Sequence, residues 1–371
     1  MRILHIAAFE GNVGDNASHI GFQNILNEID VDCKIDRLEI RKAYNNYNGI
    51  DKVIFNEDFS FLANKYDLVV FGGGGFLDYW VENSHNGTTI NIPNYIFDKI
   101  ETPILITSVG CNPHRTVPEE NYKKFKLFLD YVLTNKNITI ALRNDGSINS
   151  IVDDFGEKYL ACFSFILDNG FFYEPMSHKT LPIDGKYVAV NITNDQLEMS
   201  GIELSDANWY YNELELTINE LIARGFKIVF VPHIHQDIIA ISELLKKLPA
   251  NTIRKSTVVA PCVQGDEGTD FIFNIYKNAD LVIASRYHSN VCSLKFNVPT
   301  IGLSPLARIS YVHSQLSVYE SSFYIEKGFS KKIVKLLNEK LIKNLNLIKF
   351  KSEKEKTLRF YKEYFESLTV C

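Results

Sequence analysis

The chain of 371 residues is longer than a single hydrophobic core usually becomes, which predicts two domains. Its hydrophobic fraction of 46% and charged fraction of 23% are ordinary for a globular protein, and its net charge of −6 argues against a nucleic-acid partner. No apolar stretch approaches the roughly 18 residues that a membrane span needs, and six cysteines without a C-x-x-C pair indicate reduced thiols. We therefore expect a cytoplasmic protein.

The first half of the chain alternates apolar, strand-like runs with helical patterns, which predicts a parallel, doubly wound sheet. The expected strands are Ile3–Ala8, Leu68–Phe71, Ile104–Val109 and Ile138–Leu142, and the expected helices are Asn16–Ile29, Glu119–Leu133 and Gly146–Asp154. Two prolines and two glycines then break the pattern between Asp168 and Lys186, which indicates a domain boundary.

The second half repeats the alternation. The expected strands are Tyr187–Ile192, Lys227–Val231, Thr257–Ala260, Leu281–Ala284 and Thr300–Leu303, and the expected helices are Asn208–Arg224, Asp237–Lys247, Asp270–Lys277 and one from His288. We predict an α/β protein with two Rossmann-like, doubly wound domains, residues 1–170 and 171–371, which face each other across a cleft. Ligands of such sheets bind outside the carboxyl ends of the strands, so the loops there are the candidate sites.

The first strand ends in GNVGDNA, residues 11–17, which opens a helix. The glycines, Gly11 and Gly14, permit a tight turn, and a helix N-terminus offers free N–H groups to an anion. Asn12 and Asp15 are therefore candidate binding residues. The structural alternative is that Asp15 or Asn16 caps the helix.

Two further loops of the first half are candidates. Four successive glycines, Gly72, Gly73, Gly74 and Gly75, follow the second expected strand, and they let backbone approach a ligand or the partner domain closely. The alternative is a flexible turn. Arg143 follows the strand Ile138–Leu142 and could bind an anionic ligand or pair locally with Asp145.

In the second half, the strand Lys227–Val231 is followed by VPHIHQD. The two histidines suggest zinc, but no third ligand has a recognisable spacing. We favour helix capping by Gln236 or Asp237, with one histidine, His233, facing the cleft.

The strand Leu281–Ala284 has no polar residue and is followed by Ser285, Arg286 and His288. A guanidinium group at this position can bind phosphate or carboxylate, and an imidazole can transfer a proton near neutral pH. The alternative is that Arg286 pairs with an acid and that His288 caps a turn.

Basic residues are concentrated near the C-terminus, where residues 331–362 contain eleven Lys or Arg against three Glu. Val334, Leu337, Leu341, Leu345 and Ile348 recur there at helical spacing. This pattern predicts a C-terminal helix that packs an apolar stripe on the core. The alternative is a peripheral contact with anionic lipid at the inner face of the membrane.

Together these loops resemble the polysaccharide pyruvyl transferase family. The resemblance runs from GNVGDNA through GGGG, SVG and VPHIHQD to SRYHS and NVPTIG. It implies two Rossmann-like domains similar to GT-B glycosyltransferases. It also implies transfer of pyruvate from phosphoenolpyruvate to two hydroxyls of a saccharide or lipid-linked saccharide, which forms a cyclic ketal in the synthesis of a capsule or exopolysaccharide.

The chemistry of that reaction assigns roles to the candidate residues. His288 would be the general acid, Arg286 the anion clamp, and Asp15 would deprotonate or orient the acceptor hydroxyl. Gly11, Gly14 and Gly72–Gly75 would shape the cleft, and Arg143, His233 and Arg308 are secondary candidates. The reaction requires no metal or organic cofactor.

Two other functions fit the same pattern. A GT-B-type glycosyltransferase would share the two domains, the glycine-rich first loop and the cationic residues, and it would use a nucleotide sugar as donor. A saccharide-binding relative without catalytic activity would keep the fold alone. Binding of phosphoenolpyruvate rather than a nucleotide sugar distinguishes a pyruvyl transferase from a glycosyltransferase. Loss of activity on mutation of His288 excludes a saccharide-binding relative without catalytic activity.

Overall fold

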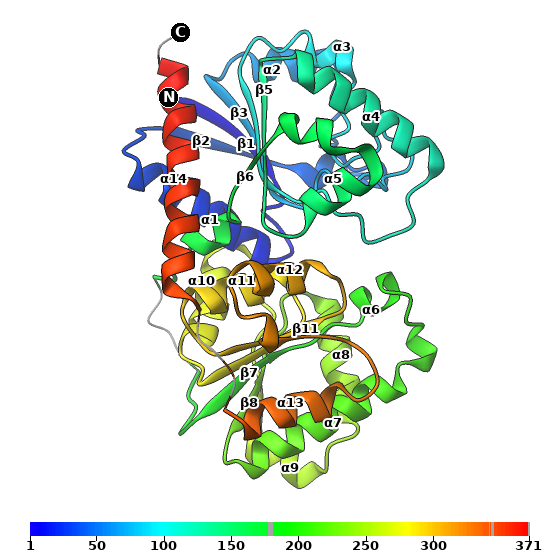
Figure 1. The fold of residues 1–371 in the computed structure, drawn as a ribbon, viewed down its shortest axis with the longest axis vertical. Helices are drawn as coiled ribbons and strands as arrows, with labels where there is room; N and C mark the ends of the chain where they lie inside the picture. Colours follow the sequence, from blue (N-terminus) through cyan, green and yellow to red (C-terminus); the bar gives the residue numbers. More distant parts are fainter. Residues whose placement is uncertain (177–180, 341, 343–344, 370–371) are drawn as a thin grey trace. The chain divides into compact units, whose positions relative to one another are not determined.

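Every strand expected from an apolar run is present in the structure, a computed structural model that describes residues 1–176, 181–340, 342 and 345–369 (Figure 1). The runs are apolar throughout because parallel strands are covered by helices on both faces of the sheet. The strands β3 (Leu68–Gly74), β4 (Ile104–Val109) and β10 (Leu281–Ala284), for example, are buried along their whole length.

The chain folds as two compact units. Unit 1 comprises Met1–Phe9, Ser18–Asn169 and Ser352–Cys371, and unit 2 comprises Glu10–Ala17 and Gly170–Lys351. The division after Asn169 lies one residue before the predicted boundary. Two segments differ from the predicted domains, because residues 10–17 belong to unit 2 and residues 352–371 to unit 1.

Unit 1 contains a six-stranded parallel sheet with the strand order β2-β1-β3-β4-β5-β6. Besides β3 and β4, its strands are β1 (Arg2–Ala7), β2 (Lys34–Glu39), β5 (Ile138–Leu142) and β6 (Phe163–Phe165). Its helices are most of α1 (Val13–Glu28), α2 (Glu57–Ala63), α3 (Asn94–Phe97), α4 (Glu119–Thr134), α5 (Ser147–Phe155) and most of α14 (Leu347–Thr369). Short 3₁₀ turns follow β2 and precede β6. The direction of the connections reverses between β1 and β3, so the loops after these two strands flank the switch point.

Unit 2 contains a second six-stranded parallel sheet with the order β12-β11-β10-β7-β8-β9. Besides β10, its strands are β7 (Tyr187–Asn191), β8 (Lys227–Phe230), β9 (Thr257–Val259), β11 (Thr300–Ser304) and β12 (Ser322–Tyr324). Its helices are α6 (Asp195–Met199), α7 (Asn208–Ala223), α8 (His235–Leu245), α9 (Ala250–Ser256), α10 (Gly265–Lys277), α11 (Tyr287–Lys295), α12 (Arg308–Gln315) and α13 (Phe329–Asn338). Counted from β7, this is the order of a dinucleotide-binding Rossmann domain, with its switch point between β7 and β10.

The sequence analysis did not predict the edge strands β2, β6 and β12. The strands β6 and β12 have three residues each, and β2 reads KIDRLE, with charged residues at four of its six positions. Edge strands of this kind are exposed on one side and carry no continuous apolar run, so their pattern does not differ from that of a loop.

The C-terminal region also differs from its prediction. The apolar stripe does not form one helix, because α13 ends at Asn338 and α14 begins at Leu347. The helix α13 buries Phe329, Ile333 and Leu336, whereas Ile348, at the start of α14, is 85% exposed. Leu341 lies outside the described residues. The helix α14 packs in unit 1 through Tyr361, whose ring contacts Phe22 and whose hydroxyl donates to Asn169 Oδ1 at 2.8 Å. These contacts explain why residues 352–371 belong to the first unit.

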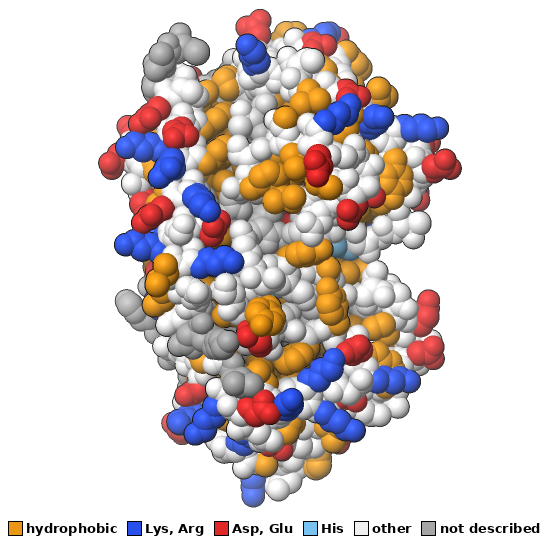
Figure 2. Space-filling model, viewed as in Figure 1, with side chains coloured by type: hydrophobic (Ala, Val, Ile, Leu, Met, Phe, Trp, Pro, Cys, Tyr) orange, Lys and Arg blue, Asp and Glu red, His pale blue; other side chains and the backbone are white. Residues whose placement is uncertain are grey.

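The basic residues of α14 are interspersed with acidic ones, as Figure 2 shows along this helix. Lys354 pairs with Glu28, Lys356 with Glu353, and Lys362 with Glu366. Pairing of this kind lowers the positive potential that a membrane surface would attract. Among the described residues, no helix is both long and apolar enough to cross a bilayer.

Candidate active site

The carboxyl ends of β7, β8 and β10 bring polar side chains together in unit 2. Asn191, the last residue of β7, accepts the backbone N–H of Arg286 at 3.0 Å and the hydroxyl of Ser289 at 3.3 Å through its side-chain oxygen. Its amide nitrogen donates to Val231 O and to Asp237. Asn191 therefore links the three loops at the switch point of the sheet, where ligands of open α/β sheets bind.

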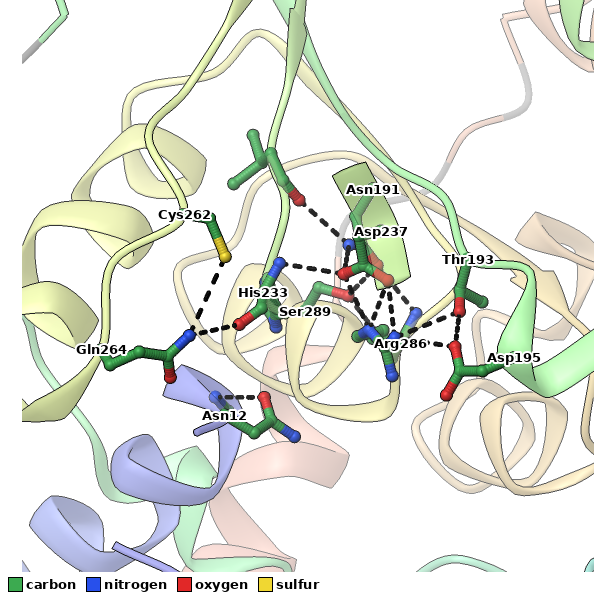
Figure 3. A network of polar contacts seen from close by, with 12 residues as sticks. Asn12, Asn191, Thr193, Asp195, His233, Asp237, Cys262, Gln264, Arg286 and Ser289 are labelled. Atoms are coloured by element: carbon green, nitrogen blue, oxygen red, sulfur yellow. Dashed lines mark hydrogen bonds and ion pairs between the residues drawn. The ribbon is translucent and has the colours of Figure 1, made fainter. Parts of the chain in front are cut away.

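Arg286 lies at the centre of this network (Figure 3). Its Nε donates to both carboxylate oxygens of Asp237, at 3.0 and 2.8 Å, and its Nη2 approaches Asp237 Oδ1 at 2.5 Å. The same Nη2 contacts Asp195 Oδ1 at 2.9 Å and Thr193 Oγ1 at 3.1 Å. Asp237 also accepts the backbone N–H of His233 at 2.9 Å, which joins the loop before α8 to the first turn of that helix. The N-cap residue of α8 is Ile234, so the expected capping by Gln236 or Asp237 is wrong in position.

The two carboxylates change the interpretation of Arg286. Burial by itself would lower the pKa of this guanidinium, but Asp237 and Asp195 together raise it above its usual value. The three groups carry a net charge of −1 because two carboxylates surround one cation. This geometry agrees with the alternative in which Arg286 pairs with an acid, and it means that an anion clamp at this position needs a second cation.

Arg308, the first residue of α12, provides a second cation nearby. With its carboxamide oxygen facing the two arginines, Gln196 accepts from Arg308 Nη2 at 3.1 Å and from Arg286 Nη1 at 3.2 Å. Two guanidinium groups thus converge on one neutral oxygen. An oxygen of a phosphate or carboxylate can be bound by the same donors.

His288 lies in the first turn of α11, buried at 5% exposure. Its Nδ1 is 3.8 Å from Asp15 Oδ1, so the two groups form an ion pair whenever the ring is protonated. A Cβ atom added to Gly14 would lie 2.9 Å from both Cβ and Nδ1 of His288, closer than such atoms approach. Gly14 therefore has to be glycine if the imidazole is to occupy this position.

The GNVGDNA loop is held in unit 2 by its own turn and by α10. Asn12 Oδ1 accepts the N–H of Gly14 at 3.0 Å, so the cap of α1 is Asn12 rather than Asp15 or Asn16, which we considered as the structural alternative. Gly11 has a φ of +93°, which only glycine adopts readily. Asn16 donates to Asp266 at 3.0 Å instead. The capping role of Asn12 leaves the Asp15 carboxylate directed at His288.

The remaining unit 2 candidates are buried. His233 is 0% exposed, and its Nε2 forms a hydrogen bond of 2.9 Å with the Tyr276 hydroxyl, whereas His235 is exposed. The two histidines therefore have different environments and do not form a ligand pair. Ser285 is also 0% exposed, and its backbone N–H donates to Asn191 O.

The glycine run of unit 1 has a structural explanation that the sequence analysis did not consider. Gly72, Gly73 and Gly74 are the last residues of β3 and are buried, and Gly75 is half-buried. A Cβ atom on Gly73 would lie 2.7 Å from the ring of His19, and one on Gly72 would lie 3.3 Å from His5 Nε2. The glycines thus make room for two buried histidines, whose ring centroids are 5.1 Å apart.

Arg143, the other unit 1 candidate, is paired within its own unit. Its Nε donates to Asp145 Oδ2 at 2.8 Å, and its Nη1 is 3.5 Å from Asp168 Oδ2. A Cβ atom on Gly110 would lie 2.5 Å from the Asp145 carboxylate, so the SVG segment accommodates this pair. The local pairing that we considered as an alternative is therefore present.

Three buried histidines predict a loss of stability in acid. Burial lowers the pKa of His5 and His233 well below the usual value, with further lowering by neighbouring positive groups, and burial lowers that of His313 to about 4. Below about pH 6.5 the unfolded chain binds protons that the folded chain does not bind. The free energy of unfolding should therefore fall by up to about 1.4 kcal/mol per pH unit for each histidine, as far as its folded pKa.

Urea unfolding at pH 7.5 and pH 5.0 measures this effect. We expect the difference between the two values to shrink in His313→Gln and to stay unchanged in His85→Gln, because His85 is exposed. Equal differences in the two variants would contradict the prediction.

Several residues of the site were not singled out from the sequence. Asn191 ends β7, and Thr193, Asp195 and Gln196 follow it. The signal in the sequence is a mostly polar run at the end of an apolar strand, NITNDQ. That signal does not specify partners, because the contacts join residues far apart in the sequence, such as Asn191 and Ser289, which are 98 positions apart.

Comparison with known proteins gives both a family and a fold. The sequence profile described as polysaccharide pyruvyl transferase matches residues 12–306. No match was found among curated proteins.

Three similar solved structures illustrate the fold. UDP-GlcNAc 2-epimerase from Methanocaldococcus jannaschii is 12% identical, with 93% of this chain and 94% of that chain covered and a TM-score of 0.53. MnaA of S. aureus, solved with UDP, is 11% identical, with 92% and 89% covered and a TM-score of 0.53. The glycotransferase of kitacinnamycin is 10% identical, with 99% and 98% covered and a TM-score of 0.51. These likenesses support the predicted GT-B-like fold of two Rossmann-like domains.

Proposed function

Because the chain belongs to the polysaccharide pyruvyl transferase family, we propose that it transfers pyruvate from phosphoenolpyruvate to a sugar of a bacterial surface polysaccharide or its precursor. The product is a cyclic ketal on two hydroxyl groups, and inorganic phosphate is released. The observation that supports this proposal most directly is the pairing of His288 with Asp15 over Gly14. That pair places an acid and a base side by side at a strand end, as an addition to an enol ester requires.

The reaction has two steps. In the first, the oxygen of one sugar hydroxyl bonds to C2 of phosphoenolpyruvate, His288 donates a proton to the methylene carbon, and Asp15 accepts the hydroxyl proton. In the second, the other hydroxyl bonds to C2 and the bond from C2 to the phosphate oxygen breaks. Phosphate leaves with the electron pair and takes up the proton that Asp15 accepted in the first step, which restores the Asp15 carboxylate. His288, neutral after the first step, accepts the proton of the second hydroxyl.

The donor carries a carboxylate and a phosphate, so it needs cations. We assign this role jointly to Arg286 and Arg308, with an anionic oxygen of the donor replacing the carboxamide oxygen of Gln196 between them. The carboxylates of Asp237 and Asp195 neutralise the charge of Arg286, so Arg308 supplies the positive charge that attracts the donor. The acceptor is a saccharide, free or lipid-linked, and the reaction requires no membrane contact of residues 331–362.

Thermal unfolding with phosphoenolpyruvate tests the donor. A ligand at 100 times its dissociation constant adds about 2.7 kcal/mol of stability, which should raise the midpoint by roughly 3 °C for a chain of this size. We expect Arg308→Gln to abolish this shift and Arg254→Gln, at an exposed position on α9, to keep it.

A second measurement then follows phosphate release with phosphoenolpyruvate and saccharide together, and mass spectrometry identifies the ketal. A midpoint shift with a UDP-, GDP- or CMP-sugar and none with phosphoenolpyruvate would overturn the proposal. It would indicate a GT-B-type glycosyltransferase instead.

A further inference from the structure

Unit 1 contains a cavity of about 750 Å³ that none of the residues assigned above lines. Its walls come from the segments that follow β2, β3 and β4, which places it at the carboxyl edge of the sheet. Its volume lies within the range of small-molecule binding sites, and its position is where ligands of such sheets bind.

The side chains that line the cavity are mostly uncharged and polar, with two aromatic rings, those of Tyr44 and Trp80. Asparagines and threonines contribute amide and hydroxyl groups, Trp80 contributes an indole, and Arg115 and Glu82 are the two charged residues. Amides and hydroxyls both donate and accept hydrogen bonds, as sugar hydroxyls do. An indole face suits the C–H face of a sugar ring. A site for phosphate or a nucleotide would instead need several cations or a helix N-terminus.

We propose that this cavity binds the acceptor saccharide, with the Trp80 indole stacked on a sugar ring. This inference rests on the proposed function for its choice of acceptor, but the binding itself does not depend on the donor. Tyr79 and Trp80 are adjacent aromatic residues that follow the glycine run. The structure separates them, because Tyr79 is 0% exposed and donates its hydroxyl to Asp154, whereas Trp80 lines the cavity.

Trp80 is held in position by contacts to the residues before and after it and to its own ring. The Asn121 side-chain amide donates to the carbonyl of Tyr79 at 3.0 Å and to that of Val81 at 3.1 Å. The Arg115 guanidinium lies 4.6 Å from the centre of the indole ring. A binding ring fixed before the ligand arrives loses little conformational entropy on binding.

The loop of residues 84–91, which contributes Thr88, Thr89 and Asn91 to the lining, is also organised by buried polar groups. Asn86 Oδ1 accepts from the backbone N–H and the hydroxyl of Thr88, both at 3.0 Å, and its amide donates to Ile90 O at 2.7 Å. Asn91 Oδ1 accepts the backbone N–H of His85 at 2.7 Å, which fixes its carboxamide at the cavity. Asn45 joins the β2 side to this loop by donating to Glu82 O at 2.9 Å.

The test uses the fact that the chain has two tryptophans, Trp80 and Trp209. Trp209 lies in α7 of unit 2 and packs against the core, so Trp209→Phe leaves Trp80 as the one indole. The probe is an array of immobilised bacterial surface polysaccharides and their repeat-unit oligosaccharides, without phosphoenolpyruvate. We expect the wild type and Trp209→Phe to bind the same glycans, and the fluorescence of Trp209→Phe to change on titration with the bound oligosaccharide.

Trp80→Ala should bind those glycans at least tenfold more weakly, and Trp80→Phe, which keeps an aromatic face, should lose less. In turnover, Trp80→Ala should raise KM for the acceptor by the same factor and leave KM for phosphoenolpyruvate unchanged, with thermal unfolding confirming the fold. Equal binding by wild type and Trp80→Ala, or no glycan binding by the wild type, would overturn the inference.

The outcomes also separate this inference from the proposed function. Phosphate release that requires both substrates but does not respond to Trp80 would leave the function standing and remove the acceptor site. Glycan binding through Trp80 without any reaction of phosphoenolpyruvate would leave the saccharide site standing and remove the proposed function.

Discussion

Replacement of His288 by asparagine should lower kcat for pyruvyl transfer by about 10²- to 10⁴-fold, the usual contribution of a general acid. Asparagine can place an amide nitrogen near the position of Nδ1 but cannot donate a proton to carbon. KM for phosphoenolpyruvate should change little, since the donor's charges are assigned to Arg286 and Arg308. Acceptor-dependent phosphate release measures the effect, and thermal unfolding verifies that the variant folds.

Two further variants test whether His288 acts through its position beside Asp15. Gly14→Ala inserts a Cβ atom 2.9 Å from the imidazole and should displace it, although alanine favours the helix by up to about 1 kcal/mol. The same change in a His288→Asn background should cause no further loss of activity. His235→Asn, at an exposed position, is the matched control. A loss of less than tenfold in His288→Asn would remove this residue from the chemistry.

The sequence predicts the sheets well because buried parallel strands are apolar along their whole length. The strands of both sheet centres were found from this pattern, and the polar residues that follow them indicated the loops of the site. Residues 10–17 were predicted as part of the first domain because they are contiguous with β1. The structure places them in unit 2 through contacts such as Asn16 with Asp266, 250 residues apart, which no local pattern records.

The charge environment of Arg286 could not be predicted for a related reason. The chain has 45 acidic residues. From the sequence alone, an arginine at a strand end could form an ion pair with any of them or bind an anionic ligand. Its pairing with Asp237 depends on β8 and β10 lying on either side of β7 in the sheet, which sets the two loops next to each other. The glycine run shows the same limit, because its contacts with His5 and His19 come from β1 and α1.

Removal of the Asp237 carboxylate should destabilise unit 2 more than any other single change at the site. Asp237→Ala leaves the Arg286 guanidinium buried without its main partner, and it also removes the acceptor for the backbone N–H of His233. Loss of one partner of a buried ion pair costs about 3–5 kcal/mol. Urea unfolding, followed by the fluorescence of Trp209 in a Trp80→Phe background, reports on unit 2.

Asp195→Ala is the matched comparison, because it removes the second carboxylate of the same network. The Asp195 side chain is 28% exposed whereas that of Asp237 is 0% exposed, so water can replace Asp195 but not Asp237. We therefore expect a loss of about 1 kcal/mol or less for Asp195→Ala, close to that of an exposed pair. Equal losses for the two variants would show that burial does not set the strength of the pair.

The double variant Asp237→Ala with Arg286→Met, compared with each of the two single variants, completes the cycle. If Asp237 mainly compensates the buried charge of Arg286, removal of both charges should cost less than the sum of the single changes, by about 0.5–3 kcal/mol. Such a protein would fold but should not bind phosphoenolpyruvate, because Arg308 would then face the donor alone. If the double variant regains stability but does not bind the donor, Arg286 has two roles. It pairs with Asp237 in the fold, and it binds the donor together with Arg308.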